Sequence, residues 1–437
     1  MSSARRLLVP GLIAGALIRV LLMPLLGTGD VDIWKVWTFA ASYSPTSVYG
    51  VGGHPTERRL LKWQGIEMVV DYPPVTIAEL GLVGRLYRSV HPLFEDSKTL
   101  NAFIKLPGVV AEALAIAAIL TVGRRKWGPD VASWMALAFW LNPGVLIDGP
   151  ILGYLDAQMA IPAAMALVAA SIGPAWLAGV LAAVAVLTKA QAVFVLPMLV
   201  AVLVRSNGGV QLGRLAAAGT GAAVTSALVV LPYIVRGAWA NLTQALGRLA
   251  MHDSLSANNA NIWWIFTWIL RVNDVWGEWG GRRALTQNLR ILAISRTIEL
   301  GYPNPRTIGL ILVGGAVAFA LWRARRPLTL AAAAALSGWC AYAYTVLAAQ
   351  VHENHLYLAI PFFTIAAALD RRYRGPMWIV AAMLTVNLML FYGLGRELPM
   401  PLDRGWTGID MSVILACANV VAFIWTTRVV ARATKTA

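Results

Sequence analysis

Long apolar runs alternate with short polar segments along the whole chain. Residues 7–27 and 327–350 are typical, and about 20 consecutive apolar residues suffice for a helix to cross the hydrocarbon core of a bilayer. Because no water satisfies the backbone inside a membrane, these runs are predicted to be helices. Counting shorter, broken stretches as well, we predict about 12 spans. They lie near residues 7–27, 101–122, 129–147, 155–172, 176–188, 191–204, 213–235, 306–322, 328–349, 357–369, 376–394 and 412–428.

Clusters of Lys and Arg between these runs predict the topology, because such clusters favour the cytoplasmic side of a membrane. An even number of spans then puts both termini in the cytoplasm. All five histidines and most carboxylates fall on the opposite face, so we expect binding or chemistry there. The clusters are Arg5 with Arg6, Arg124 to Lys126, Arg205 with Arg214, Arg323 to Arg326, Arg371 to Arg374, and Arg428 with Arg432.

Composition indicates a single all-α polytopic membrane domain over residues 1–437, because only 13% of its positions are charged. The net charge of +15 is explained by cytoplasmic loops that face anionic lipid, so it does not indicate nucleic acid. Both cysteines, Cys340 and Cys417, lie in apolar runs, which argues against a disulfide framework. The predicted outer loops cover about 28–100, 148–156, 237–305, 351–356 and 395–411.

The first outer loop holds two acidic elements. Asp30 and Asp32 follow the first apolar run directly, and partial shielding from water would make a carboxylate there basic enough to accept a proton. Alternatively, Asp30 caps the helix that follows it. Asp71 and Tyr72 precede two prolines, which fix the direction of the chain and permit a helix to start. The apolar piece 75–90 carries charges and is predicted to lie at the interface or to re-enter the membrane.

Lys189 interrupts an apolar run and is followed closely by Gln191. A lysine at that depth is costly unless it pairs or faces water, so it could hold a phosphate on the active face. The alternative is a lysine that extends to the interface from the end of a span.

His352, Glu353 and His355 form the fourth outer loop, and His252 lies in the third. The pair His352 and His355 could bind a metal, but the chain supplies no familiar set of further zinc ligands. Contact with a phosphate or a hydroxyl is the preferred interpretation, and no metal is predicted. His252 is a weaker candidate that a polar loop tip explains equally well.

Tryptophans gather in the third outer loop, namely Trp263, Trp264, Trp268, Trp276 and Trp279. Such density marks a membrane–water interface, and it also suits a groove for a sugar or a lipid headgroup. The chain has neither a Walker phosphate loop nor a dinucleotide fingerprint, which argues against a nucleotide-driven pump and against a soluble nucleotide-sugar enzyme. An internal repeat is also absent from the sequence, which disfavours a secondary transporter.

In their order and rough spacing, five motifs resemble those of the GT-C superfamily of membrane glycosyltransferases, which use polyprenyl-phosphate sugars. Gly29-Asp30-Val31-Asp32 with Trp34, followed by Asp71-Tyr72-Pro73-Pro74, is similar to the dolichyl-phosphate-glucose glucosyltransferases of the endoplasmic reticulum. The segment 142–156, with Asp148, Tyr154 and Asp156, resembles an Asn-Pro…Trp-Gly-Gln-x-Asp motif of bacterial polyprenyl-phosphate-mannose mannosyltransferases. Lys189-Ala190-Gln191 and Val351-His352-Glu353 resemble two further motifs. Two departures stand out, Leu152-Gly153-Tyr154 for Trp-Gly-Gln and Asn354 for a basic residue.

The resemblance implies a GT-C fold with about 12 membrane helices and a long first outer loop. It implies that Asp30 is the general base and that Asp32 positions the acceptor or the base. Lys189 and His352 would neutralise the leaving phosphate, and Glu353 would orient His352 or a sugar hydroxyl. The remaining substrate-binding candidates are Asp71, Tyr72, Asp148, Tyr154, Asp156, Gln191, His252 and His355.

From these points we expect an inverting hexosyltransferase, with mannose and glucose both open as the donor sugar and no cofactor. Its partners would be the polyprenyl-phosphate sugar, membrane lipids and a lipid-linked or other glycan acceptor, without nucleic acid. Abundant Ala and Arg favour a bacterial plasma membrane, with the site on its periplasmic or extracellular side. The alternative is a transporter or lipid flippase, which would place ionisable groups at mid-membrane on several spans.

Overall fold

A computed structural model describes residues 3–50, 61–205, 209–249, 252–273, 288–399 and 409–435. The fold is 76% helical, so the predicted all-α class is confirmed apart from one short hairpin. The predicted tryptophans Trp276 and Trp279 lie outside the described residues.

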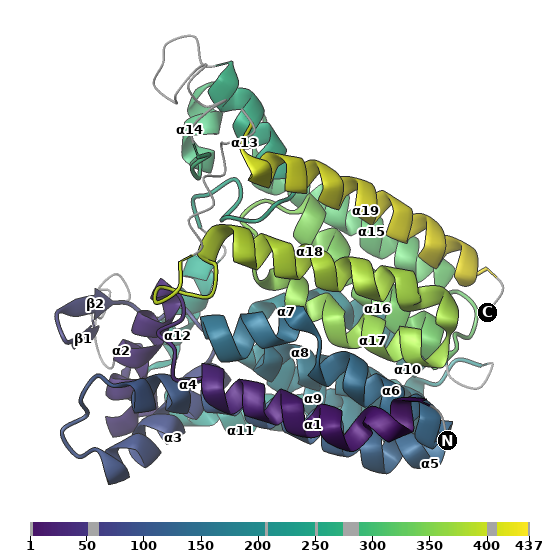
Figure 1. Cartoon of the computed structure of the whole chain (residues 1–437), viewed down its shortest axis with the longest axis horizontal. Helices are drawn as coiled ribbons and strands as arrows, with labels where there is room; N and C mark the ends of the chain where they lie inside the picture. The colour runs from purple at the N-terminus through teal and green to yellow at the C-terminus, as the bar shows by residue number, and fades with distance from the viewer. Residues whose placement is uncertain are drawn as a thin grey trace.

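The first half of the chain carries the hairpin and most of the short helices (Figure 1). Its elements are α1 (Ser3–Leu22), α2 (Gly29–Tyr43), η1 (Pro45–Ser47), β1 (Leu61–Trp63), β2 (Ile66–Met68), α3 (Pro74–Val90), α4 (Lys98–Ala118), η2 (Ile119–Gly123), α5 (Arg124–Trp127), α6 (Pro129–Trp140), α7 (Pro143–Leu146), η3 (Ile147–Leu152), α8 (Ala157–Ile172), α9 (Ala175–Thr188), η4 (Ala190–Val195), α10 (Leu196–Val204) and α11 (Leu212–Val235).

In the described residues of the second half, all the named elements are helices. They are α12 (Trp239–Leu249), α13 (Ile262–Val272), α14 (Ile294–Glu299), α15 (Pro305–Arg323), α16 (Leu330–Leu347), η7 (His355–Leu358), α17 (Ala359–Leu369), η8 (Arg371–Tyr373), α18 (Arg374–Tyr392) and α19 (Met411–Ala433). The hairpin of β1 and β2 is antiparallel, with Lys62 opposite Glu67.

Six helices in the described part of the chain are long and apolar enough to cross a membrane, and a seventh span results if the bent segments 129–140 and 143–152 are counted as one. The six are Lys98–Trp127, Leu212–Val235, Pro305–Arg323, Leu330–Leu347, Arg371–Tyr392 and Met411–Ala433. Five further apolar helices of 10–17 residues coincide with shorter predicted runs or lie in the third loop. Several membrane-spanning helices are therefore supported, and the total of about 12 stays a prediction.

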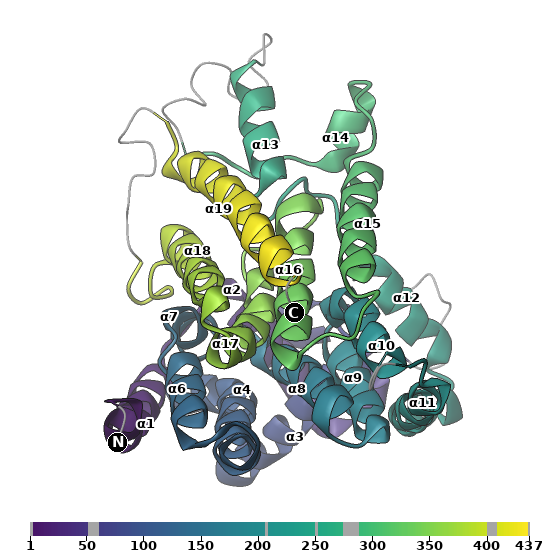
Figure 2. The same ribbon diagram turned by 90° about the vertical axis from the view of Figure 1, so that its right-hand side faces the viewer.

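Helices α16 and α17 form the centre of the bundle, while α1 and α11 lie at its flanks (Figure 2). Small residues allow this close packing, since alanine fills much of both central helices. The same holds between α9 and α11, where a Cβ on Gly179 would lie 1.8 Å from the carbonyl oxygen of Ala218. Only glycine permits that approach of the two backbones.

Helix α1 is anchored by a buried ion pair that the sequence reading did not identify. Nε of Arg19 donates to Oε2 of Glu112 on α4 at 2.7 Å, and both side chains are almost fully buried. The guanidinium also stacks 3.5 Å from the ring centroid of Trp140. The pair and the stacking therefore hold α1 against α4 and α6.

Helix α1 begins and helix α19 ends at the same end of the bundle (Figure 1). The opposite end carries α2, α3, α12 and the hairpin, which pack together beyond the long helices. Residues 75–90, expected as an interfacial or re-entrant piece, form α3, which packs along α2. All candidate site residues belong to this end.

Candidate functional site

A cavity of about 720 Å³ lies where the first residues of α2 meet the break after α9 and the loop before η7. Eight of the thirteen predicted site residues line this cavity, although they come from five separate stretches of sequence. These eight are Asp30, Asp71, Tyr72, Lys189, Gln191, His252, His352 and His355. The structure thus brings most of the motif residues into one chamber.

Asp30 stands in the first turn of α2 and faces the cavity. Burial raises the pKa of its carboxyl, and the nearby Lys189 opposes that rise. The side chain makes no helix-capping bond, since the N-cap residue is Thr28, whose amide donates to the carbonyl of Leu152 at 3.0 Å. The alternative role of Asp30 as an N-cap is therefore wrong, and the carboxyl remains directed at the chamber.

Lys189 occupies an extended break between α9 and η4. The break is fixed from outside, because the hydroxyl of Thr76 on α3 donates to the carbonyl of Thr188 at 2.6 Å. Nζ of Lys189 lies 2.8 Å from Oδ1 of Asp156, and the amide of Asn354 donates to the other oxygen of that carboxylate at 2.6 Å. Lys189 is only 3% exposed, so it is a paired, buried cation and not a lysine that reaches the interface.

His355 is held at both ring nitrogens. Nε2 lies 2.9 Å from the amide nitrogen of Gln191, and Nδ1 lies 3.0 Å from the hydroxyl of Tyr344. Tyr344 in turn stacks on Phe194, with ring centroids 3.9 Å apart. Because both ring nitrogens have partners, His355 is held in place and forms part of the cavity wall.

His352 has more freedom, with a side chain that is 37% exposed. Its ring meets that of His252 edge to face, with centroids 5.2 Å apart. Desolvation inside the cavity, together with the neighbouring His252 and Lys189, lowers the pKa of His352. The imidazole is therefore neutral at pH 7 in this state and can donate one hydrogen bond into the cavity.

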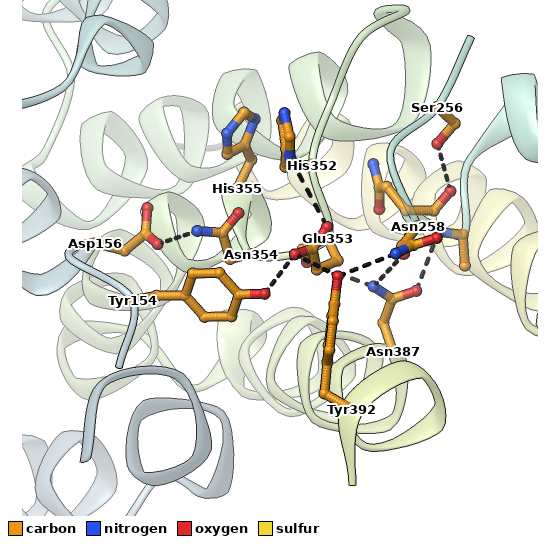
Figure 3. A network of polar contacts seen from close by, with 12 residues as sticks. Tyr154, Asp156, Ser256, Asn258, His352, Glu353, Asn354, His355, Asn387 and Tyr392 are labelled. Carbon is orange, nitrogen blue, oxygen red and sulfur yellow. Dashed lines mark hydrogen bonds and ion pairs between the residues drawn. The ribbon is translucent and has the colours of Figure 1, made fainter. Parts of the chain in front are cut away.

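Glu353 lies behind the cavity wall in a network of polar contacts (Figure 3). The hydroxyls of Tyr154 and Tyr392 both donate to its Oε1, the second at 2.9 Å. Burial raises the pKa of this carboxyl to about 7, against the hydrogen bond from Tyr154. Its Oε2 lies 3.9 Å from Nδ1 of His352, which is beyond hydrogen-bonding distance, and Glu353 is not part of the cavity lining, so both roles expected for it stay predictions.

The network also joins the third and fourth outer loops. Ala257 and His352 form a parallel bridge, and the amide of Asn258 donates to the hydroxyl of Tyr392 at 3.0 Å. Asn387 on α18 donates to the carbonyl of Asn258 at 3.1 Å. Loops that are about 95 residues apart in sequence therefore share one rigid frame.

The segment with Asp148 and Tyr154 is a π-helical turn that ends at Gly153, whose positive φ of 84° suits glycine. Lys105 donates to the carbonyls of Pro150 and Ile151 at 3.2 and 2.7 Å, so the carbonyls at the end of this buried turn have a partner. Asp148 itself is fully buried, and neither carboxyl oxygen has a hydrogen-bond partner within the described residues. It does not line the cavity, so the predicted substrate contact of Asp148 has no support in the geometry.

Asp32 also lies outside the cavity lining. Its two oxygens accept from the guanidinium of Arg396 at 2.6 and 2.9 Å, and Nζ of Lys35 lies 3.5 Å away. Asp32 is two residues after Asp30, so it lies on a different side of α2 and faces the loop that follows α18. The geometry therefore supports a structural ion pair for Asp32 and assigns the cavity carboxylates to Asp30 and Asp71.

Asp71 and Tyr72 contribute a second wall. Tyr72 packs against Trp34 and Trp37, with ring centroids 5.0 and 5.3 Å apart, and its ring centre lies 5.8 Å from Nζ of Lys189. Burial raises the pKa of Asp71, and the neighbouring His252 and Arg248 oppose that rise. An aromatic wall beside carboxylates and a cation suits a polyol that carries a negative group.

Several cavity residues were not predicted. Trp34 and Trp37 line the cavity, whereas Trp263 and Trp264, which were considered for a groove, are buried and pack into the helices. Arg306, in the first turn of α15, also lines the chamber and donates to the carbonyl of His252 at 3.0 Å. The sequence contains one clue to Arg306, because it directly follows Asn304-Pro305, which is typical of a helix start.

Comparison with known proteins adds no family. No protein-family model matches the chain, and no curated protein matches it. Among the described residues, no group of three or more His, Cys, Asp and Glu side chains is arranged to hold a metal ion. What the site can do must therefore be argued from its own geometry.

Proposed function

We propose that the chain is an inverting membrane glycosyltransferase of the GT-C type that takes a hexose from a polyprenyl-phosphate sugar. The observation that carries this proposal is the shared cavity, where Asp30 faces Lys189 and His352 across one chamber. A base, a cation and a hydrogen-bond donor around a space of this size suit transfer of a sugar away from a phosphate. The five sequence motifs add support, since residues from four of them line this chamber and Asp156 from the fifth pairs with Lys189.

In the proposed reaction, Asp30 removes the proton from an acceptor hydroxyl. The hydroxyl oxygen then attacks the anomeric carbon, forms the new glycosidic bond and breaks the bond to the phosphate oxygen, so the configuration inverts. The proton stays on Asp30, and the electron pair leaves with the phosphate. Burial supports this role, because the raised pKa of Asp30 makes it a stronger base than an exposed aspartate.

The leaving phosphate gains charge as its bond to the sugar breaks, and cavity donors would stabilise it. Lys189 is held in place by Asp156, which fixes its position while balancing its charge. His352 can donate from a neutral ring, and Arg306 adds a guanidinium at the wall. A phosphate is a good leaving group, so these donors need not include a paired general acid.

The transporter alternative predicts ionisable groups along a path through the membrane helices. Arg19, Lys105 and Glu112 are such groups, but each is bonded inside the protein and none lines the cavity. They act as structural ties between helices. That arrangement supports the enzyme over the transporter.

The direct test is sugar transfer by purified protein in detergent, with a short-chain polyprenyl-phosphate mannose or glucose as donor and a membrane extract as acceptor source. Asp30→Asn is expected to lower the rate by about 1000-fold, through loss of the base and of its charge. The matched control is Asp130→Asn, whose side chain is 54% exposed, pairs with the partly exposed Arg5 and lies outside the cavity. Equal rates for Asp30→Asn and wild type would remove Asp30 from the mechanism, and transfer with neither donor would favour another sugar or a transporter.

Chelation provides a second arm of the test. Metal binding at His352 and His355 would require His355 to leave Gln191 or Tyr344. We therefore expect transfer to be unchanged in excess EDTA. A loss that added magnesium or manganese restores would show a required ion.

A further inference from the structure

A second cavity, of about 760 Å³, lies on the other side of the Asp71–Pro74 turn from the first. Pro73 lines the first cavity and Pro74 the second, so the turn forms the partition between them. The second cavity is bounded by the end of α2, by η1, by α3 and by the last turns of α11. None of the residues assigned above to sugar transfer lines it.

The second cavity contains opposite charges that do not meet. Glu79 on α3 and Arg236 at the end of α11 both line it, and within the described residues no ion pair joins them. Burial raises the pKa of Glu79 to about 7, so its carboxylate lacks the cation that would stabilise it. The hydroxyls of Ser44 and Thr46, 3.3 Å apart, add polar atoms to the same lining. Such a cavity complements a molecule that carries both a positive and a negative group.

The position of the cavity matches the level of lipid headgroups. Helix α11 is a candidate span with only 11% of its apolar window buried, so most of its surface faces outward. Leu228 is 69% exposed and Leu231 is 52% exposed, and the apolar surface ends at Arg236. Arginine directly after an exposed apolar helix is typical of the boundary between acyl chains and headgroups.

We propose that this second cavity binds a phosphatidylethanolamine molecule, with its ammonium on Glu79, its phosphate on Arg236 and an acyl chain along the exposed face of α11. A primary ammonium donates hydrogen bonds to a carboxylate, whereas the choline headgroup has no N–H and phosphatidylglycerol has no cation. The hydroxyls of Ser44 and Thr46 complete the acceptors around the ammonium. The site is independent of the proposed sugar transfer, since binding does not require turnover.

Native mass spectrometry of the purified full chain in detergent tests this site, with palmitoyl-oleoyl phosphatidylethanolamine, phosphatidylcholine or phosphatidylglycerol added one at a time. Wild type should bind one phosphatidylethanolamine about tenfold more tightly than either other lipid, as expected for one charge-assisted hydrogen-bond set. Glu79→Gln should abolish that preference, and Arg236→Gln should weaken both zwitterionic lipids. The matched control is Arg85→Gln, an exposed residue of α3 outside the cavity, which should bind as wild type does.

Steric filling gives a readout that does not depend on charge. Ala78→Phe puts a ring into the cavity and should lower phosphatidylethanolamine binding with the charges intact. Equal affinity of wild type for the ethanolamine and choline lipids would overturn the proposal, as would a preference for phosphatidylglycerol. If Glu79→Gln does not fold, the proposal would be overturned by an Ala78→Phe variant that still prefers phosphatidylethanolamine as strongly as wild type does.

Discussion

Loss of the carboxylate that holds Lys189 should destabilise the protein strongly. Asp156→Asn leaves the ammonium 3% exposed, with its 2.8 Å partner neutralised. Removing one member of a buried ion pair costs about 3–5 kcal/mol, because the other charge stays buried. The amide of Asn can still accept from Asn354, so the packing around position 156 is kept and the cost arises from charge alone.

The assay is thermal unfolding in detergent, followed by the fluorescence of the abundant tryptophans. A loss of this size should lower the unfolding temperature by on the order of 5 °C. The matched control is Asp370→Asn, which breaks the Arg372 pair of similar length, 2.7 Å, at an exposed site. An exposed pair is worth at most about 1 kcal/mol, so the control should shift the transition far less.

A double variant separates the structural from the functional part of the pair. Lys189→Met with Asp156→Asn removes both charges, and buried ion pairs replaced by neutral groups of similar volume often fold as well as the original. Its unfolding temperature should return close to that of wild type, while sugar transfer stays low because the cation is gone. If the single Asp156→Asn variant unfolds like wild type, or the double variant transfers sugar at the wild-type rate, the assigned role of the pair is refuted.

Three further predictions follow from the same geometry. Asp32→Asn should change the transfer rate less than about fivefold, since only a partly exposed ion pair is lost, and a loss matching that of Asp30→Asn would return Asp32 to the catalytic group. Asp30 acts in its deprotonated form and burial raises its pKa, so kcat/KM should fall as the pH falls through an apparent pKa above 3.8. This acidic limb of the pH profile should persist in Glu353→Gln. If the limb disappears in that variant, the titrating group is Glu353. Glu112→Gln should lower the free energy of unfolding by about 3 kcal/mol or more, while the folded fraction transfers sugar normally. Combining it with Arg19→Met should recover the stability. If Glu112→Gln alone unfolds like wild type, the role of the buried pair is contradicted.

The sequence was sufficient to predict the helical class and the positions of most apolar helices. The run 213–235, for example, coincides with α11 at Leu212–Val235. Hydropathy could not show how far each helix continues, since α8 and α9 are shorter than a typical span and segments 129–152 bend by 45°. Those breaks depend on tertiary contacts such as that of Lys105 with the carbonyls of Pro150 and Ile151.

A residue of the cavity is easiest to select from sequence where it interrupts an apolar run. Lys189 was selected in this way, because a charge in such a run needs a reason to be there, whereas His352 was selected from a short polar loop. The side of a helix on which a residue lies was harder to infer, as Asp30 and Asp32 illustrate. Two positions apart, they lie on different sides of α2, so one faces the cavity and the other faces Arg396. Arg19 and Glu112 also interrupt apolar runs, but the sequence does not show that they pair, because they lie 93 residues apart.

Asn354 stands where the resembling family has a basic residue, and this difference changes the charge balance of the site. Its amide shares the Asp156 carboxylate with Lys189, so this carboxylate balances one cation. A basic residue at 354, as in the resembling family, would place a second cation on the same group and leave the cluster positive. In this chain the further positive charge at the cavity comes instead from Arg306, on a different helix. Arg306 has a carboxylate partner of its own, Asp253, at 4.0 Å, which is a looser pair than the 2.8 Å pair of Lys189 with Asp156, so we expect the phosphate to lie nearer the α15 side of the chamber.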